Sequence, residues 1–213
     1  LHFAASNPNS DASMIGKLLE YNPLAASQAD RKGTLPLHLA CESGHSWEVV
    51  RLIHEAYPQA VTHAEQNKRG WHALHMAAAS EVSDGTLLSE LLNLYPNAAT
   101  VSDKQDRFPM HLACTSGKVW GDGLSPLFEA NASAIRCRNQ EGLLPLHIVA
   151  FRYRYRPPTH EETLPQITNR SNRRSKSLIA LELERKTQKE HKEALELTNI
   201  FEILISDPTA LLA

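Results

Sequence analysis

Several features that would assign a chemistry to this sequence are scarce or missing. Its 213 residues contain only three cysteines, without the paired spacing of a disulfide framework, which favours a reducing compartment, the cytoplasm or nucleus. The formal charge of −2 gives no overall field that would attract nucleic acid. No apolar run approaches the roughly 20 residues of a membrane span. A glycine-rich phosphate loop, paired carboxylates and a nucleophile elbow are all missing, so we expect no enzyme and no cofactor.

A short motif recurs instead. Its clearest copy is Leu-Pro-Leu-His-Leu-Ala-Cys at positions 35–41, and the copies lie 36 or 37 residues apart. A fixed period of this size indicates a solenoid in which each unit is one supersecondary element. The first copy is clipped, so we expect the sequence to come from a longer protein. The motif histidines are His2, His38, His75, His111 and His147.

The cleanest unit spans residues 30–66. A turn at positions 30–33 is followed by a short inner helix that begins at Pro36, because proline suits the first helical position. An outer helix follows and stops at Tyr57, because the residue before a proline is pushed out of the helical region. We expect an extended return after it. The sequence therefore predicts an all-α solenoid of stacked helix-turn-helix units with short hairpin turns.

Residues 30–45, Asp-Arg-Lys-Gly-Thr-Leu-Pro-Leu-His-Leu-Ala-Cys-Glu-Ser-Gly-His, resemble the ankyrin repeat family. The resemblance implies a curved stack of helix pairs that binds other proteins on the concave face formed by hairpin tips and inner helices. The family's threonine before proline is missing, and its hydroxyl normally holds the motif histidine. We therefore expect the histidines to find backbone or water partners, or to lie partly exposed. Asp106 also stands where the family has glycine, and no glycine follows Ser80.

We expect one array over residues 1–213, with repeats at approximately 1–29, 30–66, 67–102, 103–138 and 139–213. The last repeat is about 40 residues too long, which predicts an insertion at approximately 152–193. A basic loop over 152–176 comes first, and a helix over 177–205 would extend the last outer helix. Ser175 follows two arginines and is a possible phosphorylation site. A basic segment of this kind is more commonly a solvated loop without a specific function.

The histidines and cysteines suggest two kinds of chemistry, and geometry weighs against both. Neighbouring helices pack 8–10 Å apart, so histidines one repeat apart cannot share a metal ion held at about 2.1 Å. His38 with Cys41, and His111 with Cys114, could each form a thiolate–imidazole pair. The cysteine position is alanine in sister repeats, as at Ala78, which indicates small-residue packing. We expect no catalytic and no metal-binding residues.

By the family resemblance, partner contacts come from the hairpin tips and the ends of the inner helices. The positions are Arg31, Lys32, Thr34, Glu42, Lys68, Arg69, Trp71, Lys104, Gln105, Arg107, Gln140, Glu141 and Leu143. Trp71, expected on an exposed turn, either contacts the partner or covers a neighbouring hairpin. The tips are basic, which suggests an unknown protein partner with an acidic surface. We also expect the protein to be monomeric and not to enter a membrane. Two alternatives are an anionic ligand or nucleic acid bound by the tips and the 152–176 loop, or a regulatory domain of a larger enzyme or channel.

Overall fold

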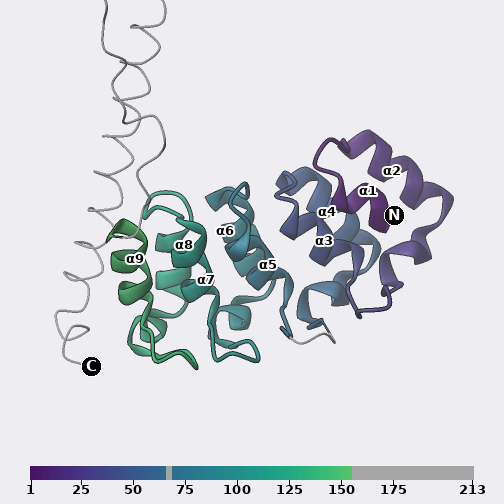
Figure 1. Cartoon of the computed structure of the whole chain (residues 1–213). Helices are drawn as coiled ribbons and strands as arrows, with labels where there is room; N and C mark the ends of the chain where they lie inside the picture. Colours follow the sequence, from purple (N-terminus) through teal and green to yellow (C-terminus); the bar gives the residue numbers. More distant parts are fainter. Residues whose placement is uncertain (66–68, 155–213) are drawn as a thin grey trace, which may run out of the picture.

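The computed structural model describes residues 1–65 and 69–154, with side chains described up to Arg152. Within these ranges the regular secondary structure is entirely helical, as the sequence predicts. The helices stand side by side in one row, with the N-terminus at one end and α9 at the other (Figure 1). Residues 155–176 of the predicted 152–176 loop, with Ser175, and the predicted helix over 177–205 lie outside the described residues.

Each of the first four repeats contributes an inner helix, an outer helix and one turn of 3-10 helix, and the outer helix is the longer of the two in the first three. Inner helices contact the next inner helix along the row, and outer helices do the same. The inner helices are α1 (His2–Ser6), α3 (Pro36–Glu42), α5 (Ala73–Ala79), α7 (Pro109–Ser116) and α9 (Pro145–Arg154). The outer helices are α2 (Ala12–Tyr21), α4 (Trp47–Ala56), α6 (Gly85–Leu94) and α8 (Leu124–Ala130).

The expected extended return does not follow each outer helix directly. A five-residue 3-10 turn comes first: η1 (Pro23–Ser27), η2 (Pro58–Thr62), η3 (Pro96–Thr100) and η4 (Ala132–Arg136). The backbone is extended at the residue after each turn. The residue before each turn, such as Tyr57 with φ −149° and ψ 83°, is non-helical and ends the outer helix. Proline then opens the first three turns, because its fixed φ near −65° suits a 3-10 start as well as an α start. Only the residue before the proline needs to leave the helical region.

Small side chains line the inner helices. Ala40, Ala77 and Ala113 have no exposed surface, and their size lets successive inner helices approach closely. Larger aliphatic residues of the outer helices, such as Leu88 and Leu124, close the core from the other side. The hydrophobic core is therefore one continuous layer between the two rows of helices.

Two of the motif histidines, His38 and His111, connect an inner helix to the residue that ends the following 3-10 turn. His38 Nδ1 accepts a hydrogen bond from the Leu35 backbone N–H at 3.2 Å, and its Nε2 donates to the His63 carbonyl at 2.9 Å. His111 repeats this pattern with Phe108 at 3.1 Å and Cys137 at 2.9 Å. The expected backbone partners are confirmed, and both rings are buried rather than exposed. Each ring needs the neutral form, because Nδ1 must accept.

Helix α5 ends without the glycine that is typical of the family at this position. The Ser83 hydroxyl donates to the Ala77 carbonyl at 2.5 Å and so satisfies one of the last carbonyls of the helix. By contrast, α7 ends at Gly117, which has a φ of +79°.

The start of the predicted insertion needs a correction. Helix α9 continues through Arg154, so Arg152 belongs to the helix and not to the basic loop. Its guanidinium donates to the Thr115 carbonyl at 2.5 Å, in the last turn of α7. Arg152 therefore stabilises a helix end, a role that loop composition does not predict.

Candidate partner-binding surface

Four hairpin tips, at residues 30–34, 65–71, 103–107 and 139–143, project along one edge of the row, which we call the hairpin edge. In three of them the first residue holds the turn with its side chain. Asp30 Oδ1 accepts from two backbone N–H groups of its own tip, both at 2.8 Å, and Asp103 and Asn139 do the same. Asp106 has a φ of +57°, the left-handed value that glycine holds in the sister tips. The tips are thus internally fixed.

Backbone hydrogen bonds join neighbouring tips. The Lys104 N–H donates to the Arg69 carbonyl at 3.0 Å, and the Gln140 N–H donates to the Gln105 carbonyl at the same distance. The Gln140 side-chain amide also donates to the Lys104 carbonyl at 2.9 Å. Three consecutive hairpins therefore form one connected edge, and Gln105 and Gln140 serve in part to hold it.

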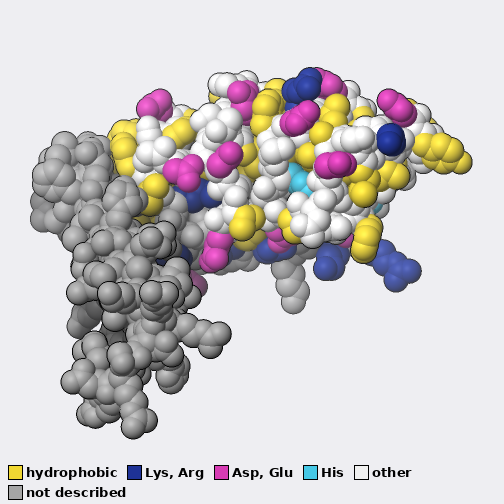
Figure 2. All heavy atoms as spheres, turned by 90° about the horizontal axis from the view of Figure 1, so that it is seen from above, with side chains coloured by type: hydrophobic (Ala, Val, Ile, Leu, Met, Phe, Trp, Pro, Cys, Tyr) yellow, Lys and Arg dark blue, Asp and Glu magenta, His cyan; other side chains and the backbone are white. Residues whose placement is uncertain are grey.

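The opposite edge of the row, at the beginnings of the outer helices, is acidic. Asp11 and Asp84 cap α2 and α6, since their carboxylates accept from the Met14 N–H at 2.7 Å and the Leu87 N–H at 2.8 Å. Asp122 accepts from the Gly85 N–H at 2.6 Å, and acidic side chains are spread over this face in Figure 2. This edge therefore carries mainly acids, whereas the hairpin edge exposes charges of both signs, with Arg31, Lys32 and Lys104 beside Asp106 and Glu141.

Trp71 does not lie exposed on its turn, so this expectation is wrong. Only 7% of the residue is exposed, and its Nε1 donates to Asp103 Oδ2 of the next hairpin at 2.8 Å. The Arg69 guanidinium lies 4.2 Å from the ring centroid and that of Arg107 lies 5.5 Å from it. Trp71 therefore covers the neighbouring hairpin, the other of the two roles that the sequence left open.

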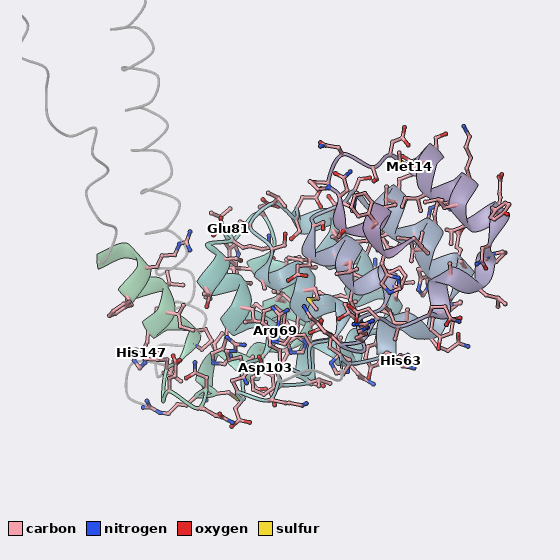
Figure 3. All side chains as sticks on the ribbon, turned by 45° about the vertical axis from the view of Figure 1, so that its right-hand side comes forward. Met14, His63, Arg69, Glu81, Asp103 and His147 are labelled. Atoms are coloured by element: carbon pink, nitrogen blue, oxygen red, sulfur yellow. The ribbon has the colours of Figure 1, made fainter. Side chains whose placement is uncertain are left out.

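Arg69 and Arg107 are the two cations that lie against Trp71, and Figure 3 shows Arg69 near Asp103. Arg69 pairs with Glu42 at 3.6 Å and Glu65 at 3.9 Å, and its side chain keeps 40% exposure. Arg107 pairs with Asp103 at 2.8 Å. Burial alone would raise the pKa of Asp103, but hydrogen bonds from Arg107, Trp71 and the Gln105 N–H hold it below its ordinary value.

The thirteen predicted contact positions divide by exposure. Two are buried: Trp71, and Thr34, whose hydroxyl donates to Glu65 Oε1 at 3.0 Å. Lys68 lies outside the described residues. Half-buried positions are Arg69, Gln105, Arg107 and Leu143. Exposed positions are Arg31, Lys32, Glu42, Lys104, Gln140 and Glu141. A role in partner binding remains a prediction for all of them.

The paired His and Cys residues pack in the core. Burial raises the pKa of the Cys41 and Cys114 thiols to about 12, so both stay protonated at neutral pH. Both ring nitrogens of His38 and of His111 are engaged with backbone groups and offer no free lone pair. In residues 1–65 and 69–154, no group of three His, Cys, Asp or Glu side chains is placed to hold a metal ion.

None of the helices in the described residues combines the length and apolar character that a membrane crossing requires. A family model for ankyrin repeats, in three copies, matches residues 1–97. These residues hold three helix pairs of the row, α1 with α2, α3 with α4 and α5 with α6. No curated protein sequence matches the chain.

Proposed function

Because residues 1–97 of this chain are ankyrin repeats, a family of generally non-catalytic protein-interaction modules, we propose that the chain is a binding platform for another protein. The hairpin edge and the adjacent inner helices would form the contact surface. The observation that carries the proposal is the connected edge itself, in which three tips are joined by backbone hydrogen bonds. A surface ordered before binding loses little conformational freedom when a partner docks.

The partner that fits this edge has an acidic surface. Arg31, Lys32 and Lys104 expose their side chains there, while the caps of the outer helices place acids on the far edge. The exposed cations would steer an acidic partner towards the tips, and the acids of the far edge would repel it there. Such steering weakens as salt shortens the range of electrostatic attraction.

The same proposal includes a monomer in the cytoplasm or nucleus. Cys41, Cys114 and Cys137 are all free thiols, which fits a reducing compartment. We also propose that residues beyond α9 complete a fifth repeat. The support is the residue-proline pair that ends earlier outer helices, as at Tyr57-Pro58, because it recurs in the sequence at Asp207-Pro208.

Affinity capture from cell extract tests the proposal. The bait is the full chain, compared with a triple variant, Arg31→Glu, Lys32→Glu and Lys104→Glu. Arg51→Glu, on the exposed side of α4, is the control for a surface charge reversed elsewhere. Specific partners should be lost with the triple variant and at raised salt, and kept with the control. Capture that resists the triple variant would contradict the proposal, and loss on nuclease treatment would favour nucleic acid instead.

A further inference from the structure

The loops that join each inner helix to its outer helix lie on the edge opposite the hairpin tips. These loops, at residues 7–11, 43–46, 80–84 and 117–123, form with the first turns of the outer helices what we call the loop edge. The Ser43 hydroxyl donates to the Ser6 carbonyl at 3.0 Å, and Lys118 Nζ donates to the Ser83 carbonyl at 2.5 Å. Between them the Val82 side chain lies directly against Gly44. The loop edge is therefore one continuous surface.

The exposed charges of the loop edge are negative. Lys118 is the one lysine or arginine of these loops, and it is only 7% exposed. Its ammonium group is directed inward, to the Ser83 carbonyl. The exposed ionisable side chains of the loop edge are Asp11, Glu48, Glu81, Asp84 and Asp122. A molecule that approaches this surface therefore meets a negative potential.

Val82 places an exposed apolar side chain among these acids. It stands seven residues after a motif histidine, as His45 and Lys118 do in the neighbouring repeats. His45 and Lys118 are 5% and 7% exposed, whereas Val82 is 71% exposed. The end of the inner helix accounts for the difference, because Ser80 after α5 is extended whereas Gly117 after α7 is left-handed. The loop after α5 thus turns outward a side chain that is more stable out of water.

One tryptophan stands on each side of Val82 along the row. Trp47 is the first residue of α4, and Trp120 lies in the 117–123 loop with its ring 5.4 Å from that of Phe128. Both tryptophans are half-buried against the core. Figure 2 shows hydrophobic side chains between the acidic ones on this face. Apolar groups rimmed by polar ones mark interaction sites, and tryptophan is enriched among the residues that carry binding energy.

Polar groups of the same loops are left unused by the fold. Within the described residues, Ser10 Oγ, His45 Nε2 and Ser80 Oγ are buried and have no hydrogen-bond partner. Each of these residues is at most 7% exposed. Buried polar groups in folded proteins are nearly always paired. A chain segment bound across the loops supplies backbone donors and acceptors of the kind that these atoms lack.

We propose that the loop edge binds a basic segment of another protein, one that also carries large apolar side chains. The apolar side chains would cover Val82 and the exposed parts of Trp47 and Trp120, while lysines or arginines meet the exposed acids. Charge complementarity selects such a segment over an acidic one. The inference is independent of the hairpin edge, which lies across the row, as Figure 3 shows for Glu81 and Asp103.

Fluorescence anisotropy with labelled synthetic peptides tests the proposal on the full chain. The probe is a peptide of about twelve residues that alternates lysine and leucine, and its counterpart has serine in place of leucine. The lysine–leucine peptide should bind at least about tenfold more tightly, because only its side chains can cover the apolar groups of the loop edge.

A triple variant locates the binding. Glu48→Lys, Glu81→Lys and Val82→Ser change exposed side chains, so the fold should be kept, which circular dichroism checks. This loop-edge variant should weaken binding of the lysine–leucine peptide at least about tenfold, because it removes both the charges and the apolar contact.

The matched control is Glu20→Lys, Glu55→Lys and Leu24→Ser. It makes the same change in net charge and removes an aliphatic side chain that is 72% exposed, against 71% for Val82. These residues lie at or beyond the other ends of the outer helices α2 and α4. Binding by the control should stay within about twofold of that of the unmodified chain.

Four results would overturn the inference. No binding of the lysine–leucine peptide is the first. Equal loss in both triple variants would mean general attraction to an acidic chain, and equal binding of both peptides would mean that the apolar groups take no part. A chain that sediments as a dimer and becomes monomeric with the loop-edge variant would assign this surface to a second copy. Arg31→Glu, Lys32→Glu and Lys104→Glu should not weaken peptide binding, which separates this test from that of the hairpin edge.

Discussion

Mild acidification should destabilise this array, because buried histidines must stay neutral in the folded state. Burial is the main cause that lowers the pKa of His38 and of His75 to about 4. In the unfolded chain both would titrate near the ordinary value of about 6.5. Below pH 6.5 the unfolded state therefore binds more protons than the folded state, and stability is lost as the pH falls from about 6.5 towards 4.

The size of the effect follows from these pKa values. At pH 5.5 an ordinary histidine is about ten-elevenths protonated, whereas a buried one with a pKa near 4 stays neutral, so each contributes about 1.4 kcal/mol to the loss. His38 and His75 together lower the free energy of unfolding by about 3 kcal/mol relative to pH 8. The pKa of His111 is also lowered, chiefly by burial, and adds to the loss. Carboxylates contribute little at this pH, because they titrate lower.

Urea unfolding followed by circular dichroism at pH 8.0 and pH 5.5 measures this loss. The variant His38→Gln with His75→Gln removes both titrating rings, so its free energies of unfolding at the two pH values should lie much closer together. His63→Gln, at an exposed ring, is the control and should keep the full difference. Equal stability of the unmodified chain at both pH values would refute the reasoning.

Three further predictions concern single positions. Trp71→Phe keeps the ring but removes the hydrogen bond to Asp103, and should cost about 1–3 kcal/mol in urea unfolding, whereas an unchanged midpoint would show that this bond contributes nothing. Asp106→Gly should raise the free energy of unfolding by about 1 kcal/mol, because glycine adopts the positive φ without strain, and a lower value would contradict the turn described. In a thiol-labelling assay the half-buried Cys137 should react first, while Cys41 and Cys114 react fast only after unfolding, and three equally reactive native thiols would disagree with the burial.

Periodicity predicted the architecture because each repeat carries its own start and stop signals. Pro36 begins a helix and Tyr57-Pro58 ends one through local backbone preferences, which the sequence displays directly. The backbone partners of His38 and His111 could be anticipated too, since buried polar groups are usually hydrogen-bonded and the family's usual hydroxyl is missing.

The position of Trp71 was beyond such reasoning, because its partner Asp103 lies 32 residues away in the next hairpin. The same is true of Arg152 and the Thr115 carbonyl, which are separated by 37 residues. Contacts between repeats depend on how the units stack, and a one-repeat pattern carries little of that information.

The acidic edge was missed for a different reason. Asp11 and Asp84 each precede a predicted outer helix, and their type is typical of helix caps, so the signal was present.

The bonds between the hairpin tips run from backbone to backbone, as from Lys104 to Arg69 and from Gln140 to Gln105. Exchanging the side chains at these positions leaves those bonds in place. Mutation can thus alter what the array recognises while its scaffold stays intact, and new specificities become accessible at small cost in folding.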